Sequence, residues 1–119
     1  MKMGTNYYLT RIPKEGEAEH KVHIGKSSFG WKFAFQISDT DCLDMGNLDL
    51  TRRNAYKVIQ DYLDKGYELR DEYGDKVELD WFTDMVDRKT QEDEHYEDGE
   101  VVRDEIVADG ARWIYSWFF

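Results

Sequence analysis

Apolar and polar residues alternate along the first third of the chain, which is the pattern of β-strands with one buried face. The alternation predicts three strands, at residues 6–12, 20–24 and 31–37. The third strand carries a row of large apolar side chains that we expect to face the core: Trp31, Phe33, Phe35 and Ile37. Pro13 ends the first strand, and the glycine-bracketed segment 25–30 is predicted to be a polar loop.

Two later stretches repeat apolar residues at the spacing of an amphipathic helix. The first begins after an N-cap at Thr51, or at Asp49 two residues earlier, and ends near Gly66. Its apolar stripe consists of Ala55, Val58, Ile59, Tyr62 and Leu63. The second helix is predicted over residues 79–88, with a buried face formed by Leu79, Phe82, Met85 and Val86.

The last quarter of the chain has a less regular pattern. Residues 90–100 are almost entirely polar and acidic, which predicts a mobile acidic loop, and 101–107 can form either a strand or a helical turn. Both faces of 111–119 are largely apolar, so this segment is expected to be an interior strand covered on both sides. Together the elements predict a single α+β domain over 1–119. Its antiparallel β-sheet combines the N-terminal strands with the aromatic C-terminal strand, and two amphipathic helices pack on one face.

Composition narrows the class of protein further. Of the 119 residues, 40% are hydrophobic and 15% are aromatic, which supports a packed core and excludes wholesale disorder. Cys42 is the single cysteine, so no internal disulfide can form, and a reducing cytoplasm is the expected location. No run approaches the roughly 18 apolar residues that a membrane span requires, and the first residues lack the apolar segment of a signal peptide. We therefore expect no membrane contact.

Charge is distributed unevenly along the chain. The 16 Lys and Arg residues and the 26 Asp and Glu residues leave a net charge of −10. Residues 1–35 hold six of the cations and three of the anions, whereas the remaining residues hold 10 cations and 23 anions. An acidic body repels nucleic-acid phosphates, so direct nucleic-acid binding is not expected. This separation of charge predicts an electric field with a direction, which steers charged partners toward the protein. The alternative is that the net negative charge serves only to keep the protein soluble.

A glycine-flanked segment in the N-terminal third gathers groups that can hold an anion. Gly25-Lys26-Ser27-Ser28 contains the Gly-Lys-Ser of a phosphate-binding loop, but His20 stands where such a loop needs its first glycine. A strand rather than a long helix is expected to follow, so nucleotide hydrolysis is not expected. A simpler anion site remains, formed by His23, Lys26, Ser27, Ser28 and Lys32. The alternative is a structural turn whose serines bond the backbone.

Neither a metal site nor a catalytic centre stands out. The soft metal ligands are His20, His23, Cys42 and His95. The first two point to opposite faces of the expected strand, which disfavours a closed zinc site. Four aspartates match a calcium loop only in part: Asp39, Asp41, Asp44 and Asp49. No nucleophile motif occurs, and acidic neighbours are expected to raise the pKa of the Cys42 thiol. We expect no metal, no cofactor and no enzymatic activity.

Two N-terminal motifs stand out, GTNYY at residues 4–8 and HIGKSSFGWKF at residues 23–33. They resemble the GTNYY and HIGKSS-x-GW-x-F motifs of a group of small uncharacterised phage and prophage proteins. A weaker similarity begins with DEYG at residues 71–74 and extends to Lys89. The Cys-x-x-Cys pair that suggests a zinc site in many members is absent here, and Glu78 stands where relatives often have a capping Ser. The resemblance implies a phage or prophage origin, without a mechanism.

Two functions from different classes follow. The first is a non-enzymatic phage accessory protein that binds a host protein, such as a defence or nucleic-acid-binding protein, and inhibits it with an acidic surface that imitates phosphates. The carboxylates expected to form that surface are Asp61, Asp64, Glu68, Asp71, Glu72, Asp75, Glu78, Asp80 and Asp84. The alternative is a small-molecule binder that holds a phosphorylated nucleotide or signal at residues 23–32. A metal-stabilised structural protein is a third alternative, and the sequence leaves the oligomeric state open.

Overall fold

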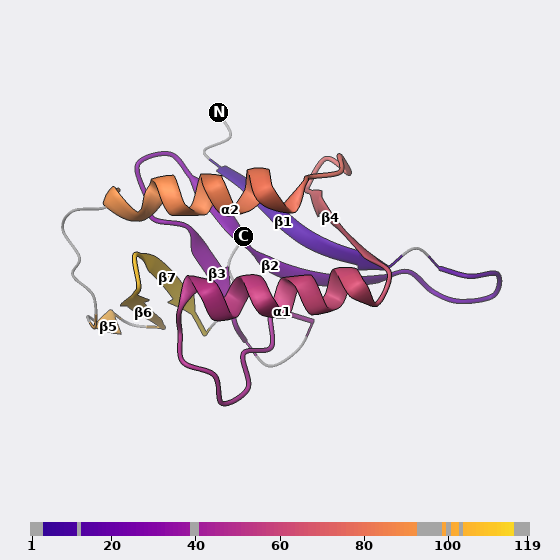
Figure 1. Cartoon of the computed structure of the whole chain (residues 1–119), viewed down its shortest axis with the longest axis horizontal. Helices are drawn as coiled ribbons and strands as arrows, with labels where there is room; N and C mark the ends of the chain where they lie inside the picture. Colours follow the sequence, from indigo (N-terminus) through magenta and orange to yellow (C-terminus); the bar gives the residue numbers. More distant parts are fainter. Residues whose placement is uncertain are drawn as a thin grey trace.

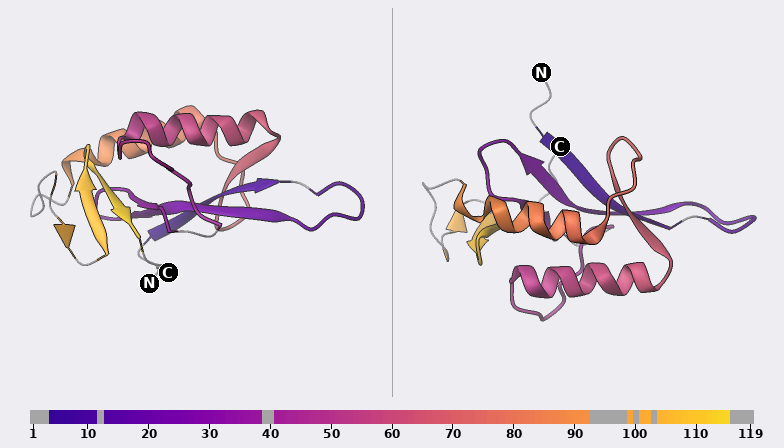
Figure 2. Two further views of the ribbon diagram at one scale, coloured as in Figure 1. Left: turned by 90° about the horizontal axis from the view of Figure 1, so that it is seen from below. Right: turned by 45° about the horizontal axis from the view of Figure 1, so that its top comes forward.

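The computed structural model describes residues 4–11, 13–38, 41–92, 99, 101–102 and 104–115. In this part of the chain one sheet has the strand order β4-β1-β2-β3-β7-β6-β5, and both helices cover the same face of it (Figure 1, Figure 2). The strands are β1 Gly4–Arg11, β2 His20–Ser28, β3 Ala34–Gln36, β4 Tyr67–Asp71, β5 Val101–Val102, β6 Glu105–Ala108 and β7 Ala111–Ile114. The helices are α1 Arg52–Asp64, α2 Leu79–Arg88 and the short 3-10 helix η1 Lys89–Gln91. The predicted α+β class is confirmed.

The named strands pair in antiparallel fashion with one exception. β3 and β7 are parallel neighbours, with Ala34 opposite Arg112 and Phe35 opposite Trp113. Parallel neighbours need a long connection, and the chain passes through both helices, β4, β5 and β6 between these two strands. This crossover brings the last described strand next to the N-terminal ones.

The core lies between the sheet and the two helices. The sheet contributes the fully buried rings of Phe35 and Trp113, which stack with their centroids 4.6 Å apart, and the fully buried Phe33 directly precedes β3. Phe82 from α2 packs edge-on against Phe33, at a centroid distance of 5.3 Å. Burial of these large rings removes much apolar surface from water, which is the dominant stabilising contribution in a small domain.

The helices form where the apolar spacing predicts them. Thr51 caps α1, because its hydroxyl accepts a hydrogen bond from the Asn54 amide at 3.1 Å. Gly66 follows this helix with a φ of +94°, a left-handed conformation that favours glycine. The second helix, α2, covers the predicted residues 79–88 and buries three of the four expected side chains: Phe82, Met85 and Val86.

The predicted polar loop at 25–30 is wrong for its first four residues, which continue β2. The β1–β2 register shifts between Tyr7 and Tyr8, so β2 bulges next to Gly25. Glycine is needed at this point because a Cβ on Gly25 would lie 2.3 Å from the Ala34 carbonyl oxygen. The glycine therefore marks a close approach of two strands and not the start of a loop.

The third predicted strand is shorter than its alternation suggests. β3 is three residues long, and Trp31 lies on the preceding turn with 41% of its surface exposed, so its predicted place in the core is wrong. Phe33 and Phe35 are buried and Ile37 packs against the core, as expected. The alternation fails at Trp31 because the chain turns at Gly30, where φ is +80°, before β3 begins.

The C-terminal elements confirm one expectation and correct others. β7 lies between β3 and β6, an interior position as predicted. The expected cover on both sides is wrong, because both helices lie on one face of the sheet and Arg112 faces away from them. The strand also ends before Tyr115, which is 48% exposed. The rest of that predicted strand, 116–119, lies outside the described residues. In the predicted acidic loop 90–100 the first two residues belong to η1, and 93–98 and 100 lie outside the described part. The next segment forms β5 and β6, which selects the strand over the helical turn.

Candidate functional site

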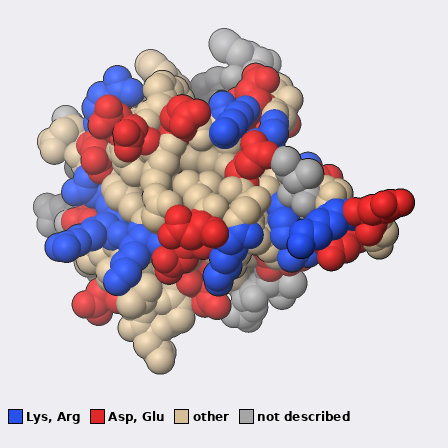
Figure 3. Space-filling view, turned by 45° about the vertical axis from the view of Figure 1, so that its right-hand side comes forward, with Lys and Arg blue, Asp and Glu red and all other residues tan. Residues whose placement is uncertain are grey.

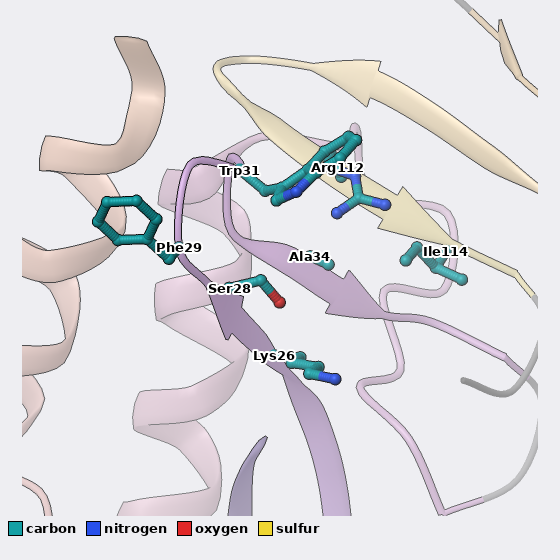
Figure 4. Close-up of a pocket in the computed structure, with 7 residues that line it drawn as sticks. All are labelled: Lys26, Ser28, Phe29, Trp31, Ala34, Arg112 and Ile114. Carbon is teal, nitrogen blue, oxygen red and sulfur yellow. The ribbon is translucent and has the colours of Figure 1, made fainter. Parts of the chain in front are cut away.

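A pocket of about 300 Å³ opens on the sheet (Figure 4). Its lining comes from three adjacent strands and the turn between β2 and β3: Lys26, Ser28, Phe29, Trp31, Ala34, Arg112 and Ile114. Ala34 pairs with Lys26 on one side and with Arg112 on the other. Because Phe35 and Trp113 are buried in the core, their strand neighbours Ala34 and Arg112 face away from the helices. The parallel β3–β7 pairing is therefore what creates this pocket.

The polar groups of the pocket extend from one side of the strands. In Figure 4 three side chains direct their polar ends to that side: Lys26, Ser28 and Arg112. Ala34 lies between Lys26 and Arg112, Ile114 lies farther along β7 beyond Arg112, and both supply apolar surface. The Phe29 ring points away from this group and is 89% exposed. The arrangement presents two cationic groups and one hydroxyl to a small anion.

Arg112 positions Trp31 at the edge of the pocket. The guanidinium carbon lies 5.0 Å from the centroid of the Trp31 ring, which is a cation–π contact. The same guanidinium donates two hydrogen bonds to the Glu105 carboxylate, from Nε at 3.2 Å and from Nη2 at 2.7 Å. These bonds fix the plane of the guanidinium, so the ring that packs against it is held as well.

Two lysines anchor the turn that carries Trp31. Lys89 of η1 donates a hydrogen bond to the Ser28 carbonyl at 2.8 Å, and the buried Lys32 donates one to the Glu92 carbonyl. Burial lowers the pKa of Lys89, and the nearby Glu92 carboxylate opposes this shift. Both contacts tie the turn to the segment that follows α2, so the end of that helix helps to shape the pocket.

The structure brings together only part of the predicted anion site. Lys26 and Ser28 line the pocket, but Ser27 lies between them on β2 and belongs by alternation to the other face of the sheet. Lys32 is directed to the Glu92 carbonyl instead of the pocket. Of the residues predicted to form the anion site, Lys26 and Ser28 therefore line the pocket and the others do not.

His23, the fifth predicted residue of the anion site, is buried and does not line the pocket. Its ring stacks on Tyr8 with centroids 5.0 Å apart, and its Nε2 donates a hydrogen bond to the Asn6 Oδ1 at 3.0 Å. Burial lowers the pKa of His23, a hydrogen bond with Gly25 opposes that shift, and the charge of Lys26 adds to it. The side chain is therefore neutral near pH 7 and contributes packing.

Among the pocket residues that the sequence did not predict, Trp31 and Arg112 bear most on function. Gly30 directly before Trp31 was a signal that the chain turns there and that the tryptophan need not face the core. For Arg112 the signal was a charged residue between Ala111 and Trp113 in an otherwise apolar strand, which marks a strand face that is not covered by core. Trp31 and Arg112 come together because the long crossover places β7 next to β3, and local sequence patterns do not predict such a long-range pairing.

Gly4 leaves the space that the long side chain of Lys26 occupies. β1 begins at Gly4, opposite Ser28 of β2. A Cβ on Gly4 would lie 2.8 Å from both the Lys26 Cε and the Ser28 Oγ, closer than real carbon atoms approach. The glycine at the start of β1 therefore permits the observed position of both polar side chains.

The predicted acidic surface does not form an uninterrupted track. Glu68 pairs with Arg70 at 3.1 Å, and Glu72 accepts a hydrogen bond from the Asn6 amide at 2.9 Å. Asp71 accepts backbone amide hydrogen bonds within its own turn. The other six carboxylates of the set are exposed: Asp61, Asp64, Asp75, Glu78, Asp80 and Asp84. On the face drawn in Figure 3, acidic groups alternate with basic groups.

Within the described residues, no cluster of three or more His, Cys, Asp and Glu side chains could hold a metal ion. Of the candidate ligands named above, His95 and Asp39 lie outside that part of the chain. Cys42 is buried, and burial raises the pKa of its thiol more than the charge of nearby Asp41 does, while a hydrogen bond from Ser38 opposes the shift. The thiol is therefore a weak nucleophile at neutral pH.

Comparisons with protein families, with curated proteins and with solved structures find no match for this chain. Among the helices described here, none is both long enough and apolar enough to cross a bilayer. The functional argument therefore depends on the pocket and on the groups around it.

Proposed function

We propose that the protein binds a small phosphate-bearing molecule in the pocket lined by Lys26, Ser28, Trp31 and Arg112. The observation that carries this proposal is the convergence of two cations and a hydroxyl, from β2 and β7, on one pocket of about 300 Å³. Lysine and arginine make the strongest hydrogen bonds that side chains offer to phosphate oxygens. Pockets for small ligands begin at roughly this volume.

The charge near the pocket supports an anionic ligand, although the protein is acidic as a whole. Four cations line the pocket or hold its turn: Lys26, Lys32, Lys89 and Arg112. Glu105 pairs with Arg112, and the Glu92 carboxylate lies near Lys89. These four cations gather at one place on an acidic molecule, which supports the binding of an anion there.

The proposed role is binding without chemistry. A catalyst needs a general base or an activated nucleophile within hydrogen-bond reach of its substrate. The described side chains that line the pocket include no carboxylate, imidazole or thiol. Because the single cysteine is free and buried, a reducing bacterial cytoplasm is the location that we propose for this binding.

Isothermal titration calorimetry with ribose 5-phosphate tests the proposal. We expect the wild-type protein to bind this probe and Lys26→Met to weaken binding at least about tenfold, because one charge-assisted contact to the phosphate is lost. Added salt should also weaken binding by the wild type, since screening reduces the attraction between exposed charges.

Lys57→Met is the matched control, because Lys57 is an exposed residue of α1 that does not line the pocket. It removes the same charge from the molecule, so it should leave the affinity for ribose 5-phosphate unchanged. Equal affinities of the wild type and Lys26→Met, or no binding at all, would contradict the proposal.

The binding of a host protein by the acidic surface stays a prediction, as does a phage origin. The exposed carboxylates of α1 and α2 support it, whereas the Glu68–Arg70 pair interrupts the expected track. The two functions use different elements, so they can be separated. Lys26→Met should weaken the binding of a phosphate-bearing ligand and leave an acid-dependent protein complex intact.

A further inference from the structure

The pocket has one feature that a bare phosphate does not require. Trp31 lies at its edge with 41% of its surface exposed, although a large apolar ring normally gains most by burial. Its backbone amide donates a hydrogen bond to the Ser28 carbonyl at 3.2 Å, and its ring packs against the Arg112 guanidinium. The exposed indole is therefore held beside the cations of the pocket.

We propose that the ligand is a mononucleotide whose base stacks on the Trp31 ring while its phosphate contacts Lys26 and Arg112. This inference rests on the proposed phosphate-binding function and specifies the class of ligand. Flat aromatic bases stack on exposed tryptophan rings, and this contact accepts any base because each has a π-face. The phosphate supplies the charge that the two cations recognise.

The size of the pocket favours one nucleotide over a chain of nucleotides. A volume of about 300 Å³ is at the lower limit for small-ligand sites, which suits one base, one sugar and one phosphate. A longer nucleic acid would extend its phosphates over the rest of a molecule whose net charge is −10. Repulsion of those phosphates disfavours a polynucleotide.

The chemistry of the lining predicts how the base is selected. Ala34 and Ile114 offer apolar surface, and no described lining residue carries an Asn or Gln amide or a carboxylate that reads the edge of a base. Stacking on Trp31 then determines the preference. A purine covers more of an indole ring than a pyrimidine does, so purine nucleotides should bind more tightly.

The anchored turn makes this recognition possible at low entropic cost. Trp31 lies on a turn, where a free side chain would lose mobility on binding. The Lys89 contact with Ser28 and the Lys32 contact with Glu92 fix that turn before the ligand arrives. Because the turn is already fixed, less conformational entropy is lost on binding, so the stacking contact contributes more to the affinity.

Calorimetric titration with adenosine 5′-monophosphate and with ribose 5-phosphate, which lacks the base, tests the inference. The wild type should bind adenosine 5′-monophosphate at least about tenfold more tightly than ribose 5-phosphate. Trp31→Leu should remove this difference, because it should weaken the binding of adenosine 5′-monophosphate far more than that of ribose 5-phosphate. Trp31→Phe, which keeps an aromatic ring, should retain much of the preference.

Trp81→Leu is the matched control, because Trp81 is an exposed tryptophan of α2 that does not line the pocket. It should leave both affinities unchanged. Equal binding of the two probes by the wild type would overturn the mononucleotide assignment and leave the phosphate-binding proposal standing. Failure of both probes to bind would overturn both proposals. A short single-stranded oligodeoxynucleotide that binds more tightly than adenosine 5′-monophosphate would also overturn the assignment.

Discussion

His23 illustrates at the residue scale how one buried side chain makes stability depend on pH. The ring is 8% exposed, stacks on Tyr8 and donates a hydrogen bond to Asn6, and its burial disfavours the charged imidazolium. Its folded-state pKa is lower than the ordinary value of 6.5. Between these two values the unfolded chain binds the proton more readily than the folded one, so protonation favours unfolding.

We therefore predict that the stabilising effect of neutral His23 is fully present above about pH 6.5 and declines as the pH falls through the folded-state pKa. One proton contributes a slope of at most about 1.4 kcal/mol per pH unit. Urea unfolding at a series of pH values measures this slope. In His23→Gln, which cannot titrate, the slope between pH 6.5 and 5 should be shallower; an unchanged slope would contradict the assignment.

At the scale of elements, Arg52 joins three parts of the fold. From the first turn of α1, its Nη1 donates a hydrogen bond to Asp87 of α2 at 2.7 Å. Its backbone amide and its Nε donate to Asp109, in the turn between β6 and β7, at 2.7 and 2.8 Å. The hydroxyl of Tyr56 also donates to Asp87, and burial together with this bond raises the pKa of Tyr56. The network holds both helices in register with the C-terminal hairpin.

Arg52→Met should lower the free energy of unfolding by about 1–2 kcal/mol, because charge-assisted hydrogen bonds are lost while partial exposure of the pair limits their strength. Differential scanning calorimetry or urea titration measures the change. Arg53→Met is the matched control, since Arg53 is its exposed neighbour in α1 and should cost much less. Equal losses in the two variants would refute the role of the network.

Elements with strong local signals are predictable from the sequence, and α2 is the clearest case. The apolar spacing of α2 predicts both of its ends, and the capping residue Thr51 predicts the start of α1. β2 and β3 are harder to predict, because Gly25 stands inside a strand where a glycine usually suggests a loop. Only the contact between that glycine and Ala34, residues on different strands, decides between the two structures.

The candidate site is less predictable than the fold. Lys26 and Ser28 belong to a recognisable motif, but Arg112 lies close to them because β3 and β7 pair in parallel. A parallel pairing depends on the whole crossover and not on any local pattern. Lys32 belongs to the same motif, yet it donates a hydrogen bond to the Glu92 carbonyl and so has a structural role. Residue type and spacing therefore identify the chemistry available, while topology selects the residues that meet.

At the scale of the whole molecule, the separation of charge along the chain does not become a simple separation in space. Cations within the acidic part pair with carboxylates nearby, as Arg52 does with Asp87 and Arg112 with Glu105. Figure 3 shows the mixture of both signs on one face. A local gathering of cations at the β2–β3 turn is consequently a more specific feature than the net charge, and it is the feature on which the proposed function depends.

A ¹⁵N–¹H correlation spectrum recorded during titration with adenosine 5′-monophosphate tests the central claim most directly, because it locates the ligand without a substitution. The account predicts that the shifted amides cluster at residues 26–34 and 111–114, the strands and turn that line the pocket. Shifts concentrated on α1, β4 and α2, or a spectrum that the nucleotide leaves unchanged, would contradict it.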